Sequence, residues 1–178
     1  MGSKLVFING ATLRLAIDRI AHEIAERSGG SARWVVLGVQ TGGVHLATRL
    51  SGALSRLSGV AVPAGQIDVS MHRDDLSHRP VPMVHATNLP GDVSGASVIL
   101  TDDVLYSGRT VRAALDALHD FGRPERVQLA VLIDRLGDRH LPIQADYFAR
   151  RLETRPGQRV DVRWAEDGGD DCIYLETP

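Results

Sequence analysis

Apolar residues recur along the chain with the periods of helices and strands. Between residues 13 and 24 they fall at helical spacing, after Thr12 as the expected cap and before Gly29-Gly30 as the stop. The apolar run Trp34–Val39 predicts a strand. A glycine loop follows, and the apolar residues between 44 and 54 share one face of a second predicted helix.

The order of strand, glycine loop and helix then occurs a second time. Residues 97–101 predict a strand, which is followed by a loop through Gly108 and a helix from about Thr110. Residues 127–133 form a short unbroken apolar run, which is typical of a strand buried on both faces of a parallel sheet. The expected fold class is therefore α/β, with a central parallel sheet flanked by helices.

Two segments depart from this order. Residues 66–72 alternate as a strand does, and a proline-rich polar stretch follows, so we expect a small hood with a flexible lid loop over approximately residues 62–96. Approximately residues 159–175 predict a C-terminal hairpin of two short strands. Because no repeat, low-complexity tract or interdomain linker interrupts the sequence, residues 1–178 are expected to form a single domain.

The composition narrows the class of protein. A chain of 178 residues with 43% apolar and 24% charged residues fits one globular domain. The net charge of −2 argues against a protein that coats nucleic acid by bulk electrostatics alone. Cys172 is the only cysteine, which excludes an internal disulfide and a structural zinc site. Since neither a membrane span nor a signal segment is evident, we expect a cytoplasmic protein without a membrane partner.

Candidate chemistry is concentrated in residues 98–110, VILTDDVLYSGRT. Gly108 lets the backbone approach a phosphate, the helix N-terminus attracts an anion, and Ser107 and Thr110 supply hydroxyl donors. The acids Asp102 and Asp103 would be repelled by phosphate alone, but they can accept hydrogen bonds from two ribose hydroxyls. The string therefore indicates a site for ribose 5-phosphate. The alternative is an ordinary strand-to-helix connection with solvated acids and capping residues.

The first glycine loop is expected at the same place. In an open parallel sheet, ligands bind at the carboxyl ends of the strands, and both loops leave strands at that edge. The first loop consists of Gln40, Thr41, Gly42 and Gly43. The two loops can therefore share one ligand.

The string around Asp102 resembles the signature of the type I phosphoribosyltransferases. The resemblance implies the fold of that class, with Asp102 and Asp103 holding the ribose of phosphoribosyl diphosphate. The residues implied to bind its 5′-phosphate are Leu105, Tyr106, Ser107, Gly108, Arg109 and Thr110. Magnesium would arrive bound to the diphosphate, and the protein would position the reactants, stabilise the leaving group and exclude water.

Over nearly the whole chain, the sequence resembles the bifunctional pyrimidine operon attenuator and uracil phosphoribosyltransferase family. The segments that carry the resemblance are RIAHEI at 19–24, VPAGQIDVSMHRDDL at 62–76, TDDVLYSGRTVRAALDAL at 101–118, GRPERVQLAVLIDR at 122–135 and LPIQAD at 141–146. The resemblance implies uracil as the base, UMP as the product, and a homodimer or homotetramer.

The diphosphate loop departs from the pattern of this family. Where the family commonly has GIKTRG, this chain has GVQTGG at residues 38–43, without the two basic side chains. The loop is still expected to bind the diphosphate, through backbone amides. Arg73 of the lid segment could supply the missing charge, so we expect it to be catalytic together with Asp102 and Asp103. The alternative for Arg73 is a solvated arginine at a strand end.

The base pocket is expected after the apolar run 127–133, from Asp134, Arg135 and Leu136. The first two match the family, but the segment after them is one residue longer than the family's DRGHRELP. Buried backbone groups that pair with uracil would reject a purine, and an inserted residue could move those groups. The alternative for Asp134 and Arg135 is an ion pair at the end of the strand.

In the regulatory members, the resemblance implies an RNA-binding surface on the first helix and after the base pocket. The residues that match this surface are Arg19, His22, Arg27, Arg139 and Arg150. Arginines can bind phosphates and stack on bases. Two positions depart from the regulators, which tend to have threonine in place of Asp18 and arginine in place of Gln144. The alternative is an ordinary surface ion pair between residues four apart, such as Arg19 and Glu23.

Two classes of function follow from these expectations. The first is an enzyme that makes UMP and diphosphate from uracil and phosphoribosyl diphosphate, and that could also bind leader mRNA in response to UMP. The second is a nucleotide-sensing RNA-binding regulator with little or no catalysis. A third alternative is a phosphoribosyltransferase for another base.

Overall fold

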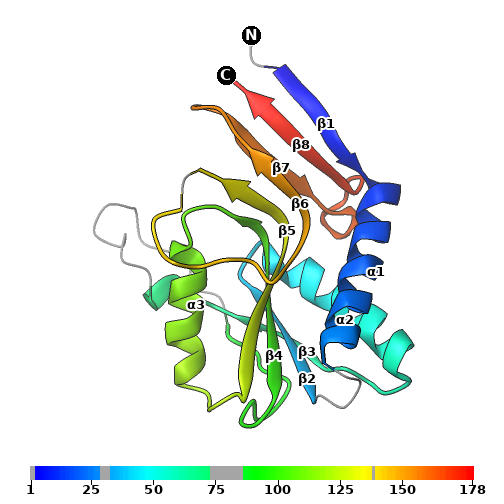
Figure 1. The fold of residues 1–178 in the computed structure, drawn as a ribbon, viewed down its shortest axis with the longest axis vertical. Coiled ribbons are helices and arrows are strands. Elements are labelled where there is room, and N and C mark those ends of the chain that lie inside the picture. The colour runs from blue at the N-terminus through cyan, green and yellow to red at the C-terminus, as the bar shows by residue number, and fades with distance from the viewer. Residues whose placement is uncertain (1–2, 29–32, 73–85, 138) are drawn as a thin grey trace.

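The computed structural model describes residues 3–28, 33–72, 86–137 and 139–178, which form two sheets and three α-helices (Figure 1). The larger sheet is parallel, in the order β3 (Ala64–Ile67), β2 (Trp34–Val39), β4 (Ser97–Leu105), β5 (Arg126–Leu136) and β6 (Tyr147–Glu153). The smaller sheet is antiparallel, in the order β1 (Ser3–Asn9), β8 (Cys172–Thr177) and β7 (Arg159–Arg163). The helices are α1 (Gly10–Arg27), α2 (Gly43–Ser58) and α3 (Arg109–His119). The expected α/β class, with a central parallel sheet between helices, is confirmed.

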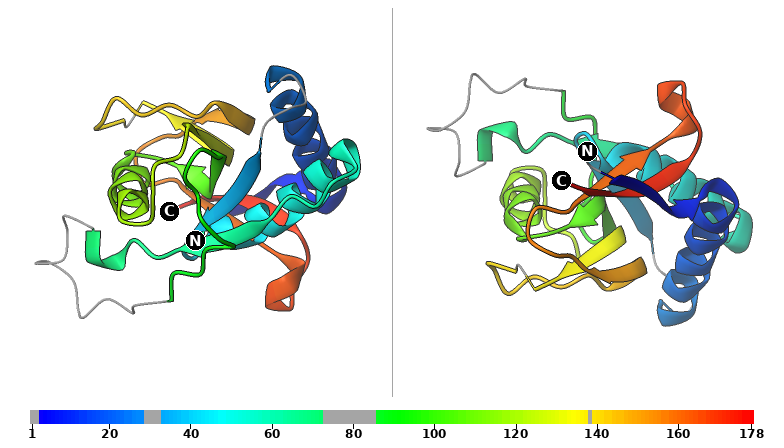
Figure 2. Two further views of the ribbon diagram at one scale, coloured as in Figure 1. Left: turned by 90° about the horizontal axis from the view of Figure 1, so that it is seen from below. Right: turned by 90° about the horizontal axis from the view of Figure 1, so that it is seen from above.

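Strand β2 shows how the two faces of the larger sheet are covered. All its side chains are buried, and they alternate between two core clusters. Trp34 and Val36 belong to the cluster with α1 and α2, whereas Val35, Leu37 and Val39 belong to the cluster with α3. Helices α1 and α2 therefore cover one face and α3 covers the other (Figure 2). Burial on both faces explains why the sequence of the strand is apolar without a break.

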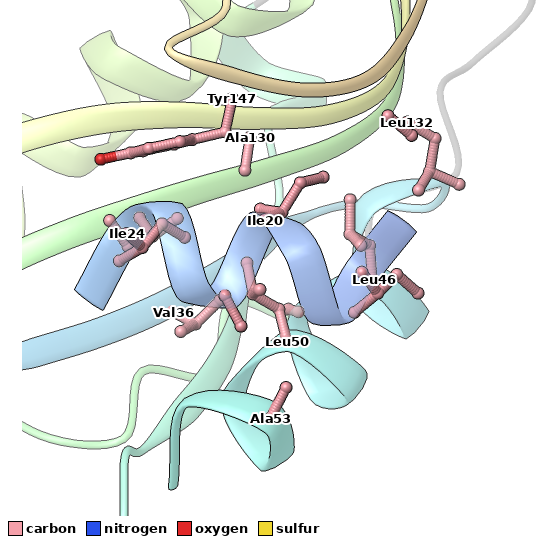
Figure 3. Close-up of a cluster of buried hydrophobic side chains, with 14 of the residues drawn as sticks. Ile20, Ile24, Val36, Leu46, Leu50, Ala53, Ala130, Leu132 and Tyr147 are labelled. Atoms are coloured by element: carbon pink, nitrogen blue, oxygen red, sulfur yellow. The ribbon is translucent and has the colours of Figure 1, made fainter. Parts of the chain in front are cut away.

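The cluster under α1 and α2 explains the helical spacing of the apolar residues. Ile20 and Ile24 of α1, Leu46 and Leu50 of α2 and Val36 of the sheet belong to one cluster of buried side chains (Figure 3). In each helix the two residues are one turn apart, so their side chains lie on the same face. Within the parts of the chain that the structure describes, no helix is long and apolar enough to span a membrane.

The smaller sheet joins the two ends of the chain (Figure 1). From here on we call this sheet the hood, although the sequence placed a hood at residues 62–96. Strand β8 pairs antiparallel with both β7 and β1, and β7 and β8 lie in the region for which the sequence predicted a hairpin. Strand β1 was not predicted, because most of its side chains are exposed and their pattern does not alternate. Of the segment 62–96, in which the sequence suggested a hood, β3 joins the larger sheet, and residues 73–85 lie outside the described residues.

Two local predictions were wrong because short polar side chains form hydrogen bonds with nearby backbone. The side chain of Asn9 accepts a hydrogen bond from the N–H of Thr12 at 3.0 Å, so Asn9 is the cap of α1 and Thr12 lies in its first turn. The strand expected over residues 66–72 ends early. The carboxylate of Asp68 accepts hydrogen bonds from the N–H and hydroxyl of Ser70, and the chain forms a 3-10 turn there.

Strands β4 and β5 of the larger sheet are longer than predicted, since β5 runs to Leu136, and β6 was not predicted. Strand β4 continues to Leu105, so Asp102 and Asp103 lie in the strand and not in the loop after it. Strand β6 had no counterpart in the prediction. Only Tyr147 and Ala149 are buried in it, and its other positions are mostly charged, as suits the edge of a sheet.

Candidate active site

The loop between β4 and α3 has the geometry of an anion site. Gly108 lies immediately before the first residue of α3 and has a φ of 90°, a conformation that other residues rarely adopt. Its carbonyl oxygen accepts a hydrogen bond from the N–H of Arg112 at 2.9 Å, so the helix is regular from its first turn. The first amides of α3 and the positive end of its dipole are therefore directed at this loop. We call Tyr106, Ser107 and Gly108 the phosphate loop.

The acid pair lies just before the phosphate loop and is held by its own backbone. Asp102 is buried and its Oδ1 accepts a hydrogen bond from the N–H of Asp103 at 3.0 Å. Oδ1 of Asp103 accepts one from the N–H of Val104 at 2.7 Å. Burial raises the pKa of Asp103, and the hydrogen bond from the N–H of Val104 opposes that rise in part. Both carboxylates are therefore oriented at the end of β4.

The loop after β2 packs directly on this acid pair. A Cβ atom on Gly42 would lie 2.5 Å from Cγ of Asp103, and a Cβ on Gly43 would lie 1.9 Å from the carbonyl oxygen of Thr101. The hydroxyl of Thr101 donates to the carbonyl oxygen of Gly43 at 2.8 Å. The first glycine loop thus packs against the carboxyl-terminal part of β4, the strand that leads into the phosphate loop. Gln40 and Thr41 belong to the same loop, whereas Arg73 lies outside the described residues.

A hollow of about 560 Å³ opens beside the phosphate loop, and we call it the Tyr106 hollow. The guanidinium of Arg135 lies 4.0 Å from the centre of the Tyr106 ring and donates to the hydroxyl of Thr154 at 2.7 Å. Arg135 and Leu136, expected in the base pocket, both line this hollow. Thr154 and Gln158 line it too, and the sequence analysis missed them because no motif marks the connection between β6 and β7.

Asp134, the third residue expected at the base, is part of an ion-pair cluster. Its side chain is buried; Oδ1 accepts a hydrogen bond from Arg139 at 2.5 Å, and Oδ2 accepts one from Arg151 at 3.2 Å. Asp134 is not among the residues that line the Tyr106 hollow. Asp134 thus pairs with Arg139 and Arg151, and not with Arg135 as in the alternative that the sequence left open. Asp134, Arg135 and Leu136 together line a second hollow of about 410 Å³, and their assignment to the base stays a prediction.

The residues expected to bind RNA lie in three places: in a groove, elsewhere on the exposed face of α1, and beside Asp134. Arg19 and Arg150 line one groove of about 520 Å³ between α1 and β6, together with Phe148 and with Arg151, which the sequence analysis did not select. Arg19 donates to the carbonyl oxygen of Phe148 at 2.8 Å, and it also forms the expected surface ion pair with Glu23. We call this the α1–β6 groove.

The other candidates on α1 are exposed, but Arg139 is not on this surface. His22 and Arg27 are exposed on α1, and the guanidinium of Arg27 lies 4.9 Å from the centre of the Tyr147 ring. Arg139 is not among the residues that line the groove, and its side chain is only 22% exposed because it is bound to Asp134. The structure thus separates Arg139 from the other candidates.

Charged side chains attach the hood to α2, directly after the diphosphate loop. Arg49 donates to Asp171 at 2.7 Å and to Glu166 at 2.6 Å, and these hydrogen bonds lower the pKa of both carboxyl groups. Nε2 of His45 lies 3.1 Å from Oδ1 of Asp167. The hood therefore has a fixed contact with the helix whose N-terminus faces the acid pair.

The chemistry of the acid pair is compatible with a hard cation. Carboxylate oxygens are the ligands that Mg²⁺ prefers, and Asp102 and Asp103 present them at the edge of the site. Among the described residues, no group of three or more histidine, cysteine, aspartate or glutamate side chains could enclose a metal ion.

Comparison with known proteins agrees with this geometry. Residues 9–167 match the model of the phosphoribosyl transferase domain family. The chain is 50% identical to the bifunctional protein PyrR of Roseiflexus sp. (strain RS-1), over 98% of this chain and 96% of that protein. It is 49% identical to the bifunctional protein PyrR of Deinococcus radiodurans, over 98% of this chain and 96% of that protein. The chain belongs to the bifunctional PyrR family.

Membership of the PyrR family confirms the resemblance on which the sequence expectations rested, and it makes the protein a phosphoribosyltransferase. The fold agrees as well. The hypoxanthine phosphoribosyltransferase of Trypanosoma cruzi superposes with a TM-score of 0.74 at 20% identity, over 97% of this chain and 96% of that one. As a phosphoribosyltransferase of this fold, the protein uses phosphoribosyl diphosphate and a base. The roles of individual residues stay predictions.

Proposed function

We propose that the protein transfers ribose 5-phosphate from phosphoribosyl diphosphate to uracil, which gives UMP and diphosphate. The contact of Gly42 with the carboxylate of Asp103 carries the proposal. Through that contact, an acid pair and the N-termini of α2 and α3 lie at one edge of the sheet, in a chain of the PyrR family. This arrangement suits a ligand with a ribose between two phosphate groups.

In this proposal, each part of the edge has one task. Asp102 and Asp103 accept hydrogen bonds from the ribose hydroxyls, and the residues from Leu105 to Thr110 donate to the 5′-phosphate. The reaction breaks the bond between the ribosyl carbon and the diphosphate, and positive charge develops on the ribose. The two nearby carboxylates stabilise that charge, and the fixed loops hold the reacting atoms in line.

The leaving diphosphate is bound without basic side chains from its own loop. The amides of Gly42 and Gly43 and the N-terminus of α2 attract it instead. Arg73 stays a predicted contributor of positive charge. Magnesium bound to the diphosphate would supply further charge neutralisation, and the oxygens of Asp102 and Asp103 are the donors that would contact it.

The Tyr106 hollow is our proposed place for the base. It lies directly beside the phosphate loop, and its wall carries hydrogen-bonding groups from Arg135, Thr154 and Gln158. A site that pairs with polar groups of uracil would leave those groups unpaired against a purine. The proposal therefore includes selection of uracil over hypoxanthine.

The test is formation of UMP by the purified protein with phosphoribosyl diphosphate and magnesium. We expect turnover of uracil and none of hypoxanthine. The variant Asp102→Asn/Asp103→Asn serves as the control and should lose the activity. Turnover of another base in place of uracil would refute the specificity, and no turnover of any base would refute the enzymatic proposal.

We also propose a second function, UMP-dependent binding of leader mRNA at the α1–β6 groove. Arg19, Arg150 and Arg151 line this groove together with the ring of Phe148, and such a combination suits phosphates and splayed bases. The guanidinium of Arg151 lies 4.3 Å from the centre of that ring. If RNA binding occurs without any turnover, the protein is a nucleotide-sensing regulator.

Binding of a labelled leader-RNA hairpin, with and without UMP, tests this second function. We expect tighter binding with UMP, and weaker binding when Arg150 is changed to glutamine. Salt-sensitive binding to any RNA, independent of UMP, would exclude specific regulation. A homodimer or homotetramer and a cytoplasmic location stay predictions for this protein.

A further inference from the structure

The segment after β5 is bonded to the back of the phosphate loop. Nη1 of Arg139 donates a hydrogen bond to the carbonyl oxygen of Tyr106. The N–H of the next residue, His140, donates to the carbonyl oxygen of Ser107 at 3.0 Å. Two consecutive carbonyl groups of the loop are therefore held by two consecutive residues of another segment.

Apolar contacts continue the same support. The side chains of Leu141 and Ile143 lie 3.6 and 3.4 Å from the position that a Cβ of Gly108 would occupy. Gly108 has a positive φ, so the loop depends on its surroundings to keep this shape. The segment from Arg139 to Ile143 thus contacts every residue of the phosphate loop.

Arg139 is itself oriented by a buried acid. Its Nη2 donates to Oδ1 of Asp134 at 2.5 Å, while its Nη1 donates to the loop. The side chain of Asp134 is 5% exposed, and that of Arg139 is 22% exposed. A planar guanidinium can connect two acceptors at a fixed angle, which an ammonium group cannot do. Asp134 therefore fixes the direction from which Arg139 reaches the loop.

Arg151, the second partner of Asp134, does not connect this acid to the phosphate loop. Nε of Arg151 lies 3.2 Å from Oδ2 of Asp134, but its side chain is 53% exposed and it lines the α1–β6 groove. Within the part of the chain that the structure describes, the side chain of Arg151 donates to Asp134 and not to the phosphate loop. Arg151 is therefore a matched control for Arg139, because both pair with the same carboxylate.

We propose that Arg139, oriented by Asp134, is a positioning residue that keeps the phosphate loop in the shape that binds a 5′-phosphate. This assigns Arg139 to the nucleotide site and not to the RNA surface expected from the family. The proposal rests on the proposed role of the phosphate loop. It needs neither uracil specificity nor RNA binding.

The test is calorimetric binding of ribose 5-phosphate and of UMP to the full-length protein. We expect Arg139→Gln and Asp134→Asn to weaken the binding of both ligands about tenfold. The first change removes the hydrogen bond from the guanidinium to the loop, and the second removes the negative charge that orients the guanidinium. Arg139→Lys keeps the positive charge but lacks the planar guanidinium, so its affinity for both ligands should lie between those of the wild type and Arg139→Gln. Arg151→Gln should change either affinity less than about twofold, which is the range of a half-exposed pair.

Kinetics separate positioning from general damage. In Arg139→Gln, the KM for phosphoribosyl diphosphate should rise about tenfold, while the KM for uracil stays within about twofold of the wild type. An equal rise in both KM values would overturn the proposal. So would unchanged affinity for ribose 5-phosphate in the folded Arg139→Gln or Arg139→Lys variant, or equal losses in Arg139→Gln and Arg151→Gln. Wild-type protein that binds ribose 5-phosphate but forms no UMP would refute the uracil activity and leave this inference standing.

Discussion

The two glycines at the start of α2 differ in what lies next to them, which allows a sharp test of the site. At Gly42 a Cβ would meet the carboxylate of Asp103, the end of a side chain, with contacts of 2.5 to 2.6 Å. At Gly43 it would meet the backbone of Thr101, with contacts of 1.9 and 2.7 Å. A side chain can rotate away, whereas the backbone of a central strand cannot. Gly42→Ala should therefore affect function, and Gly43→Ala should affect stability.

The expected magnitudes follow from these contacts. Gly42 has helical angles, φ −64° and ψ −31°, so alanine brings no backbone strain there and reduces the entropy of the unfolded chain, worth about 0.4 to 1 kcal/mol. Displacing the Asp103 carboxylate from the ribose removes a hydrogen bond to a charged group, about 1.5 to 3 kcal/mol, or roughly 10- to 150-fold in kcat/KM. Gly43→Ala forces overpacking against the strand, which costs about 3 kcal/mol and lowers Tm by roughly 6 to 12 °C.

Both variants are measured by calorimetric unfolding and by steady-state kinetics with phosphoribosyl diphosphate as the varied substrate. Gly42→Ala should unfold within about 2 °C of the wild type and lose most of its kcat/KM. If Gly42→Ala keeps full activity, the Asp103 carboxylate does not need its present position, and its assignment to the ribose is wrong. If Gly43→Ala unfolds like the wild type, the close packing of this glycine against strand β4 is wrong.

Three further predictions concern the hood, the phosphate loop and the core. Because Arg49 lowers the pKa of Glu166 and Asp171, their contribution to stability is present above the ordinary values of 4.5 and 3.8 and is lost as the pH falls below them. The difference in unfolding free energy between wild type and Arg49→Gln should therefore shrink in urea titrations below pH 4.5; a constant difference would contradict this. Gly108→Ala should cost about 1 to 2 kcal/mol, because φ is 90°, and should raise the KM for phosphoribosyl diphosphate more than that for uracil. Leu50→Ala should cost about 2 to 5 kcal/mol in urea unfolding, because the side chain is fully buried, and a loss below 1 kcal/mol would contradict the packing of α2.

The parts of the fold that the sequence predicted are those that local patterns determine. Strand β2 is apolar on both faces because helices cover both, and that burial is visible as an unbroken run in the sequence. Strands β1 and β6 were missed for the opposite reason. They lie at sheet edges, where few side chains are buried, so hydrogen bonding to a neighbour and not hydrophobicity makes them strands.

In the candidate site, too, local sequence patterns predicted some features, whereas others depend on residues that are distant in the sequence. The phosphate loop was identifiable because its glycine, hydroxyls and acids are contiguous in the sequence. The partners of Asp134 were not identifiable. Arg139 and Arg151 reach it from a turn and from the neighbouring strand, and the same letters fit a base pocket, an RNA surface or an ion pair. Only the direction of the side chains separates these possibilities.

The missing basic residue at position 42 and the burial of Asp103 are parts of one arrangement. In the sequence they are independent, since position 42 differs from the family pattern and position 103 agrees with it. In the structure, any side chain at position 42 would occupy the place of the Asp103 carboxylate. Glycine lets the backbone approach that carboxylate, and the resulting loss of water raises its pKa. An arginine at position 42 would therefore not simply add charge to the proposed diphosphate site, because it would also move Asp103, the acid that we propose to bind the ribose. In the proposed site, the loop therefore attracts diphosphate through its amides, because the acid already fills the space beside Gly42.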